Sequence, residues 1–433
     1  MSRCRFWFVV LSLICFSIPG RIPAAHGAVP PDSLEISIGL DRPDHIYTLG
    51  ETARFTIRMR LGGKAVERDS LDYRLSNDGA AVIEEGVVAV NDGTAEIAGR
   101  MAGPGFLRLD ISRDGLESRR SFRAAAAFNP TAIMPTTPVP ENYDLFWNQG
   151  KAELERIPVD PRETESPERS SDDIRVINVS LANVDGSRVY GWLSLPTTPG
   201  PHPAVLYIPG AGVGPLRPVK SYPKQGVAVF HMSVHGIDND LPPEYFQKLR
   251  GGILRDYPRQ GADDPYRFFY RRVILGAFRV LDYLAEREDI DGGRLGVAGS
   301  SQGGALSLLV GGLDGRVKAL TANVPAMCDH CGHYYGRPSG WPGLWRTGDR
   351  RRLERTLGYF DAAVAASRIR VPALMAVGFI DNACPPTTVY AAYNVITGPK
   401  TMDNYPLMAH AFGPGWADKA VGWLVDRLKE EGE

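Results

Sequence analysis

The sequence has no excess of charge of either sign. Lys and Arg number 49 and Asp and Glu number 50, which gives a formal net charge of −1. A protein that binds nucleic acid through its phosphates carries a basic face or stripe, so this balance argues against a nucleic-acid partner. The charges are also mixed along the chain, as they are in ordinary globular proteins.

Long hydrophobic runs are lacking as well. The apolar run at residues 6–18 is shorter than the ~20 residues that a membrane-spanning helix needs, so we expect no membrane span. Arg3 and Arg5 precede this run, and the small-x-small pattern Ala25-His26-Gly27 follows it. A basic start, an apolar stretch and a cleavage pattern in this order predict a secretory signal peptide over residues 1–27, and hence export to the periplasm or the medium.

Cysteine is scarce. Five cysteines are present, and only Cys328, Cys331 and Cys384 lie outside the predicted signal peptide, too few for a disulfide scaffold. His330 and His333 flank Cys331, but a structural zinc site commonly takes two separated ligand pairs and only one pair exists here. Plain packing is therefore favoured over a local disulfide or a metal, and we expect no metal and no cofactor.

The chain then changes character twice. Residues 28–128 contain short alternating segments separated by Gly, Asn and Asp turns, which predicts a small immunoglobulin-like β-sandwich with a structural or carbohydrate-facing role. Residues 129–172 predict a linker with a helical extension of the domain that follows. Over residues 173–433, apolar strands alternate with helices, which indicates an α/β domain whose mainly parallel sheet is covered on both faces. Its clearest helix is expected over 266–288, capped by Asp264.

A candidate nucleophile lies between a strand and a helix of this domain. The strand at 295–297 runs into Gly299-Ser300-Ser301-Gln302-Gly303, and a helix is expected from Gln302. The G-x-S-x-G turn needs small residues two before and two after its serine, because the turn is tight and the helix packs close to the strand. Ser301 has glycine at both places, whereas Ser300 would have Ala298 and the bulky Gln302. The pattern therefore predicts Ser301 as the nucleophile.

A serine hydroxyl needs a base to take its proton and an acid to orient the base. In this kind of fold the chain order is Ser, then acid, then His. His410 is the histidine that follows a suitable acid, because Asp381 ends an apolar strand at the edge where functional groups gather. Asp403 is the alternative acid, but it lies within the strand that leads to His410.

The oxyanion of an acyl-transfer reaction is held by two backbone amides. One comes from the residue after the nucleophile, Gln302, and the other from the loop after an earlier strand. That loop is residues 207–215, rich in glycine. Gly210 is favoured as the second donor, with Ala211 next.

These residues carry a resemblance to a known family. From about residue 140 onward the chain resembles the acetyl xylan esterase/cephalosporin-C deacetylase family, carbohydrate esterase family 7. The matching stretches are residues 141–147, 189–193, 269–273, 299–304, 381–386 and 391–394. The resemblance implies an α/β-hydrolase fold that removes acetyl groups from carbohydrates through an acetyl-enzyme, with Ser301, Asp381 and His410 as the triad and Gln302 and Gly210 at the oxyanion. The resemblance also implies that copies of this chain associate into a homo-oligomer.

The sequence departs from the family pattern in two places. The family's Arg-Gly-Gln triplet reads His235-Gly236-Ile237, and its His-Glu pair reads His410-Ala411. His231 and His235 lie near this departure and could line the site, with His235 as the candidate substrate-binding residue, although a plain structural role is favoured for them. Trp341 and Trp345 are two more, because their stretch follows the strand after Ser301 and can fold over the pocket, where indole rings pack well on sugar faces. The alternative for both tryptophans is packing.

Two other functions fit parts of the pattern. One is a serine peptidase of the prolyl-oligopeptidase type, but its β domain would be a propeller much larger than residues 28–128. The other is a non-catalytic glycan-binding protein with a hydrolase fold, which an intact Ser301, Asp381 and His410 argue against. The sequence therefore predicts an exported serine carbohydrate esterase.

Overall fold

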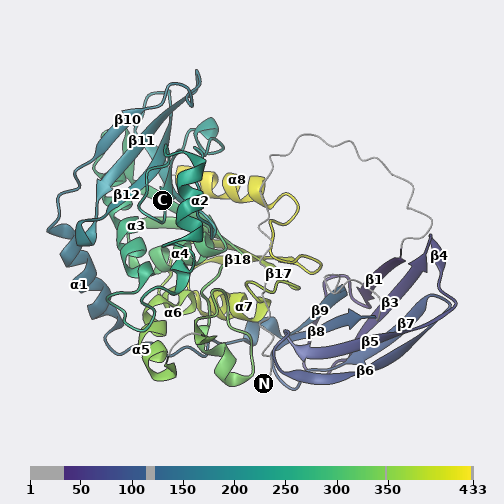
Figure 1. The fold of residues 1–433 in the computed structure, drawn as a ribbon. Coiled ribbons are helices and arrows are strands. Elements are labelled where there is room, and N and C mark those ends of the chain that lie inside the picture. Colours follow the sequence, from purple (N-terminus) through teal and green to yellow (C-terminus); the bar gives the residue numbers. More distant parts are fainter. Residues whose placement is uncertain (1–33, 114–121, 347–348, 431–433) are drawn as a thin grey trace, which may run out of the picture.

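The computed structural model describes residues 34–113, 122–346 and 349–430 (Figure 1). The predicted signal peptide lies outside the described residues. Two domains follow each other along the chain, an all-β domain and a larger α/β domain. Within the described part of the chain, every helix is too short or too polar to cross a membrane.

The all-β domain is built from strands of alternating burial. Its strands are β1 Leu34–Leu40, β2 Ile46–Tyr47, β3 Ala53–Leu61, β4 Lys64–Ala65, β5 Arg68–Asn77, β6 Val82–Asn91, β7 Thr94–Gly99, β8 Gly105–Ser112 and β9 Phe122–Phe128. They join in one hydrogen-bonded order, β1-β3-β7-β6-β5-β8-β9-β2, with β4 on β3. Strand β1 begins this order, and it also contacts β9, which lies near the opposite end of the order. The sheet therefore folds back around a core that contains Phe55, Ile57 and Leu109.

The α/β domain contains a second nine-stranded sheet. Its strands are β10 Arg162–Glu165, β11 Ile174–Ala182, β12 Arg188–Pro196, β13 His202–Ile208, β14 Ala228–Ser233, β15 Ile290–Ser300, β16 Val317–Asn323, β17 Ala373–Gly378 and β18 Lys400–Tyr405. The order is β10-β11-β12-β14-β13-β15-β16-β17-β18. The pairs β10–β11, β11–β12 and β12–β14 are antiparallel. The pairs β14–β13, β13–β15, β15–β16, β16–β17 and β17–β18 are parallel.

Helices cover both faces of this sheet. They are α1 Tyr143–Glu155, α2 Pro243–Gly251, α3 Phe269–Ala285, α4 Gln302–Leu313, α5 Arg350–Phe360, α6 Ala362–Ala366, α7 Pro386–Val395 and α8 Trp416–Lys429. Successive residues of β13 show the two faces: Leu206 belongs to the core shared with α3 and α4, while Val205 packs with Leu424 and Leu428 of α8. A sheet buried on both faces explains why its strands are continuous apolar runs.

Three details differ from the sequence-based expectations. Helix α3 begins at Phe269, not at 266, because the Asp264 carboxylate accepts the N–H of Tyr266 in a local turn and does not cap the helix. Strand β5 was not anticipated, since charged side chains such as Arg68 and Arg74 lie among its apolar residues. Strand β10 lies within the predicted linker, yet it joins the second sheet.

Candidate active site

The G-x-S-x-G turn sits between β15 and α4, as the spacing predicted. Ser301 adopts φ 56° and ψ −117°, a strained conformation that raises its side chain above the sheet edge. A Cβ on Gly303 would lie 1.9 Å from the Ile208 carbonyl oxygen, and one on Gly299 would lie 2.3 Å from the Gly303 carbonyl carbon. Both flanking glycines are therefore required by close backbone approach.

The structure brings Ser301, His410 and Asp381 into one chain of hydrogen bonds. His410 Nε2 lies 2.9 Å from Ser301 Oγ, and His410 Nδ1 lies 2.7 Å from Asp381 Oδ2. The other Asp381 oxygen, Oδ1, accepts the N–H groups of Ala383 and Cys384 at 2.8 and 2.9 Å. The fully buried Asp381 side chain thus acts only as an acceptor, so Nδ1 donates and Nε2 is left to accept the serine proton.

The two residues weighed as alternatives lie elsewhere. Ser300, the residue before Ser301, has an Oγ that accepts a hydrogen bond from Asn323 Nδ2 at 2.9 Å. Asp403 forms an ion pair with Lys419 at 2.7 Å. Neither is engaged with His410, which agrees with the choice of Ser301 and Asp381 from spacing and chain order.

The two predicted oxyanion donors lie beside Ser301. Gln302 is the first residue of α4, where a backbone N–H has no intrahelical acceptor. Gly210 is adjacent, because a Cβ built on it would lie 3.5 Å from the Ser300 carbonyl oxygen and 3.9 Å from Ser301 Cβ. Gly210 and Ala211 both belong to the loop after β13, at the same sheet edge.

Two buried tyrosines hold this region, and sequence reasoning missed them. The hydroxyls of Tyr257 and Tyr270 each donate to Gln302 Oε1 at 2.8 Å, and the Tyr257 hydroxyl also accepts the Gly212 N–H at 3.3 Å. Burial raises the pKa of both tyrosines, so both remain proton donors. A usable signal existed only for Tyr270, which lies within the stretch at residues 269–273 that resembles the family.

His235 supports the same loop from behind. Its Nε2 lies 2.7 Å from the Gly212 carbonyl oxygen, and its ring meets Tyr257 edge to face at 4.6 Å. Burial lowers the pKa of His235, so the ring is neutral and Nε2 carries the proton that it donates to the carbonyl. With 7% of its surface exposed, His235 is buried behind this loop, as the structural alternative describes.

The two tryptophans have different neighbours. The Trp341 backbone N–H donates to the Ala383 carbonyl at 2.9 Å, two residues from Asp381, and its ring packs partly on the domain core. The Trp345 ring stacks on His333, with centroids 3.6 Å apart, and has the Arg346 guanidinium 4.9 Å away. Trp341 is therefore bonded to the loop that carries Asp381, whereas Trp345 packs on its own local neighbours.

The three described cysteines are free and buried. Cys328 and Cys331 therefore form no disulfide with each other. Ligand atoms of Cys384, Asp381 and His410 lie within 4.8 Å of one another. Burial raises the pKa of the Cys384 thiol well above its usual range.

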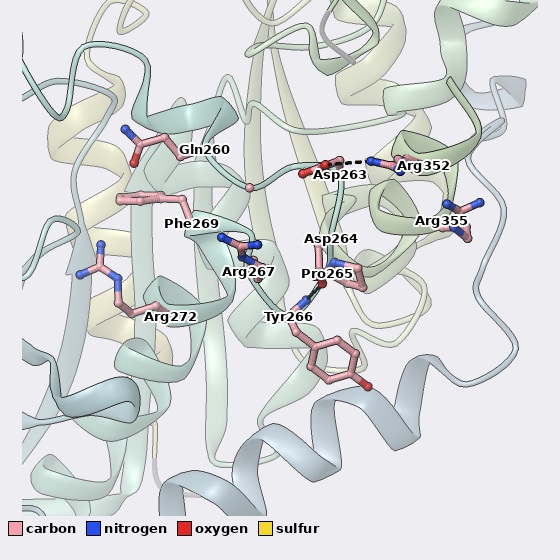
Figure 2. A pocket seen from close by; sticks show the side chains of 11 residues that line it. Gln260, Asp263, Asp264, Pro265, Tyr266, Arg267, Phe269, Arg272, Arg352 and Arg355 are labelled. Atoms are coloured by element: carbon pink, nitrogen blue, oxygen red, sulfur yellow. Dashed lines mark hydrogen bonds and ion pairs between the residues drawn. The ribbon is translucent and has the colours of Figure 1, made fainter. Parts of the chain in front are cut away.

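A groove of about 1040 Å³ opens near the start of α3. Figure 2 shows Arg267, Arg272 and Arg355 along it and the Arg352–Asp263 ion pair at one rim. Its lining includes Phe269, whose ring contacts Tyr257 at 5.0 Å, but none of the predicted catalytic residues. The groove and the Ser301–His410–Asp381 hydrogen-bond chain are thus formed by different residues.

Comparisons with known proteins agree with this arrangement. The family model described as acetyl xylan esterase matches residues 131–333 and 346–427, which include Ser301, Asp381 and His410. The acetyl esterase Axe7A of Xylanibacter ruminicola is 32% identical over 394 residues, covering 89% of each chain. That alignment is longer than the chain from residue 131 to its end, so it includes part of the β domain.

Solved structures also resemble the α/β domain. An acetyl xylan esterase from Paenibacillus sp. R4 is 29% identical with a TM-score of 0.60, covering 69% of this chain and 98% of that one. Acetyl xylan esterase 1 from Thermoanaerobacterium sp. JW/SL YS485 has the same TM-score at 24% identity, covering 69% and 97%, which shows a shared fold. The sheet described above is thus of the α/β-hydrolase type.

Proposed function

Because the chain belongs to the acetyl xylan esterase family and is a carboxylic ester hydrolase, we propose that it removes O-acetyl groups from carbohydrates. The observation that carries the proposal is the Ser301–His410–Asp381 hydrogen-bond chain at the start of α4. A base positioned on a serine and oriented by a buried carboxylate is the arrangement that acyl transfer to water requires.

In the proposed first step, Ser301 Oγ attacks the acetyl carbonyl carbon while His410 Nε2 takes the serine proton. The buried Asp381 carboxylate stabilises the positive charge that forms on the imidazole. The backbone N–H groups of Gln302 and Gly210 donate to the oxygen that becomes negative. The tetrahedral intermediate then collapses, His410 returns the proton to the departing sugar oxygen, and an acetyl-enzyme remains on Ser301.

In the second step a water molecule takes the place of the sugar. His410 removes a proton from this water, which attacks the acetyl carbon, and the same two amides hold the oxyanion. Acetate leaves and the proton returns to Ser301. The exposed edge of His410, whose side chain is 34% accessible, gives water a route to Nε2.

Three finer assignments belong to the same proposal. The order of basic, apolar and small residues within positions 1–27 supports export after cleavage of a signal peptide. The alternating strands of the N-terminal domain support an immunoglobulin-like fold for it. A homo-oligomer is proposed from the family resemblance alone, and light scattering of the purified protein would test it.

The proposal is tested with the purified full chain on three substrates. Acetylated xylan and p-nitrophenyl acetate are expected to release acetate, whereas a proline-containing chromogenic peptide is expected to stay intact. Peptide cleavage without acetate release would contradict the proposal and favour a peptidase. Extending the assay to acetylated mannan, pectin and small sugar acetates identifies the preferred sugar.

A further inference from the structure

The loop that carries Asp381 is contacted by the β domain. We define the acid loop as residues 379–385, between β17 and α7. Strand β8 contacts α7, and β8 and β9 form the side of the β domain nearest to it (Figure 1). Three residues of the β domain, Asp78, Phe106 and Arg108, contact the acid loop or the helix that follows it.

Phe106 contacts the start of the acid loop and the helix that follows the loop. Its ring meets Phe379 edge to face at 5.1 Å and lies 5.8 Å from Tyr390 of α7. Phe106 is fully buried and belongs to the core of the α/β domain, not to that of its own domain. The two domains therefore share apolar packing on both sides of Asp381.

Arg108 reaches into the loop itself. Its Nη1 donates to Asn382 Oδ1 at 2.5 Å, and Asn382 is the residue directly after Asp381. Its Nη2 donates to Asp110 at 2.8 Å, and Asp110 also accepts from Arg123 at 3.0 Å. The side chain of Arg108 is only 11% exposed, so its guanidinium is held in one place by the β domain and presents a fixed donor to the loop.

Asp78 fixes the far end of the loop. Its Oδ2 accepts the N–H of Thr387 at 3.0 Å, in the first turn of α7. Helix α7 has Pro385 at its N-cap position and no side-chain cap of its own, so Asp78 supplies from the other domain the acceptor that a helix start needs. The backbone of Asp78 is held in turn, since its N–H donates to the Phe106 carbonyl at 2.8 Å.

We propose that Asp78 and Arg108 are positioning residues for Asp381, so that the β domain forms part of the support of the catalytic carboxylate. Asp381 must keep one oxygen on two loop amides and the other on His410, which requires the loop to hold a single conformation. Arg108 fixes the residue after Asp381 and Asp78 fixes the helix that closes the loop. Neither residue touches the substrate, and the proposal holds for any acetyl ester.

The test uses Asp78→Ala and Arg108→Ala in the full chain, with p-nitrophenyl acetate as substrate. A shift of a catalytic group by about 1 Å costs on the order of 100-fold in rate, so we expect kcat to fall about 10- to 100-fold for each variant. KM should change little, because the contacts to the ester are intact. Asp78→Asn keeps an acceptor for the Thr387 N–H and should retain most of the wild-type kcat.

A double-variant measurement separates positioning from general damage. In an Asp381→Asn background, Asp78→Ala should lower the residual kcat by less than 3-fold, because the group on which it acts has already been disabled. Asn382→Ala removes the Arg108 contact from the hydrolase side without altering the β domain, and it should reproduce the Arg108→Ala loss. This variant keeps the test decisive if a β-domain variant fails to fold.

Ile57→Ala is the matched control, because Ile57 is fully buried in the β-domain core and belongs to a separate cluster from Phe106. It should lower the melting temperature with kcat nearly unchanged below that temperature. Equal kcat losses from Ile57→Ala and Asp78→Ala, or an undiminished Asp78→Ala effect in the Asp381→Asn background, would overturn the proposal.

Discussion

At the scale of single residues, Ser301 and Ser300 provide a controlled comparison within one turn. They are adjacent, yet the strained backbone of Ser301 directs its hydroxyl to His410, while Ser300 bonds to Asn323. Side-chain direction is reversed between neighbours at the end of a strand, so one position separates the serine that contacts His410 from the serine that contacts Asn323.

The first prediction concerns these two serines. Ser301→Ala should lower kcat on p-nitrophenyl acetate on the order of 10³-fold or more, because no covalent intermediate can form. Ser300→Ala removes only the acceptor of the Asn323 amide and should keep most of the activity. The reverse pattern would place the nucleophile at Ser300.

The second prediction concerns the acid. Asp381→Asn should lower kcat on the order of 10³-fold, because an amide in this place neither stabilises the imidazolium nor selects the Nδ1–H tautomer of His410. Asp403→Asn breaks an exposed ion pair with Lys419 and should change kcat little. Steady-state kinetics of both variants decides between them, and a larger loss at Asp403 would refute the assignment.

At the scale of elements, the parallel strands bring distant segments to one edge. The turns after β13, β15 and β17 deliver Gly210, Ser301 and Asp381, and His410 follows β18. The carboxyl ends of parallel strands meet at the same side of the sheet, which is why these residues converge although they are far apart in sequence. The segment after β16, residues 324–346, begins at the same edge.

The third prediction concerns this segment. The Trp341 backbone N–H donates to the Ala383 carbonyl, which places this residue beside the acid loop. We predict that its indole packs on the sugar, so Trp341→Ala should raise KM for acetylated xylo-oligosaccharides roughly 5-fold or more. KM for p-nitrophenyl acetate should change little, because this small ester does not reach the indole. Trp345→Ala is the matched control, since the Trp345 ring already stacks on His333. Equal effects of Trp341→Ala on both substrates, with a lower melting temperature, would indicate packing.

At the scale of the whole molecule, the contact between the two domains contains a buried acid. Burial raises the pKa of Asp78 from 3.8 to about 7, against the opposing effects of its hydrogen bond to Thr387 and of the Arg108 charge. The charge of Asp381 raises the pKa of Asp78 further. The second oxygen of Asp78 has no hydrogen-bond partner among the described residues.

The fourth prediction is a pH dependence of stability. Between about pH 4 and pH 7 the folded chain keeps a proton on Asp78 that the unfolded chain has released, so this residue's contribution to stability is lost as the pH rises through that window. Asp78→Asn has no group to titrate there. The melting temperature of Asp78→Asn minus that of the wild type should therefore rise between pH 4 and 7, by roughly a few degrees, and level off above pH 8.

Scanning calorimetry across this range provides the measurement, and taking the difference between the two proteins cancels the other titrating groups. A difference that is flat with pH would mean that Asp78 keeps an ordinary pKa. A difference that falls with rising pH would mean that the Asp78 charge stabilises the domain contact.

The sequence by itself determined the features that rest on local chemistry. The two glycines around Ser301, the continuous apolar strands and the order Ser301, Asp381, His410 are readable from a single chain, because tight turns, burial on both faces and chain order leave local patterns. These patterns predicted the α/β-hydrolase fold, the ester hydrolase class and the residues that the structure brings together. The tyrosines on Gln302 had no comparable local pattern.

Only the tertiary structure decided how the two domains cooperate and what His235 does. Asp78 meets the first turn of α7 across 309 residues of chain and Arg108 meets the acid loop across 274, and nothing in their own neighbourhoods predicts those partners. The sequence left His235 as a candidate for substrate binding or for a structural role, and the fold buries it with Nε2 against the Gly212 carbonyl oxygen. A side chain's environment is set by long-range packing, which a local pattern does not encode, so these assignments required the fold.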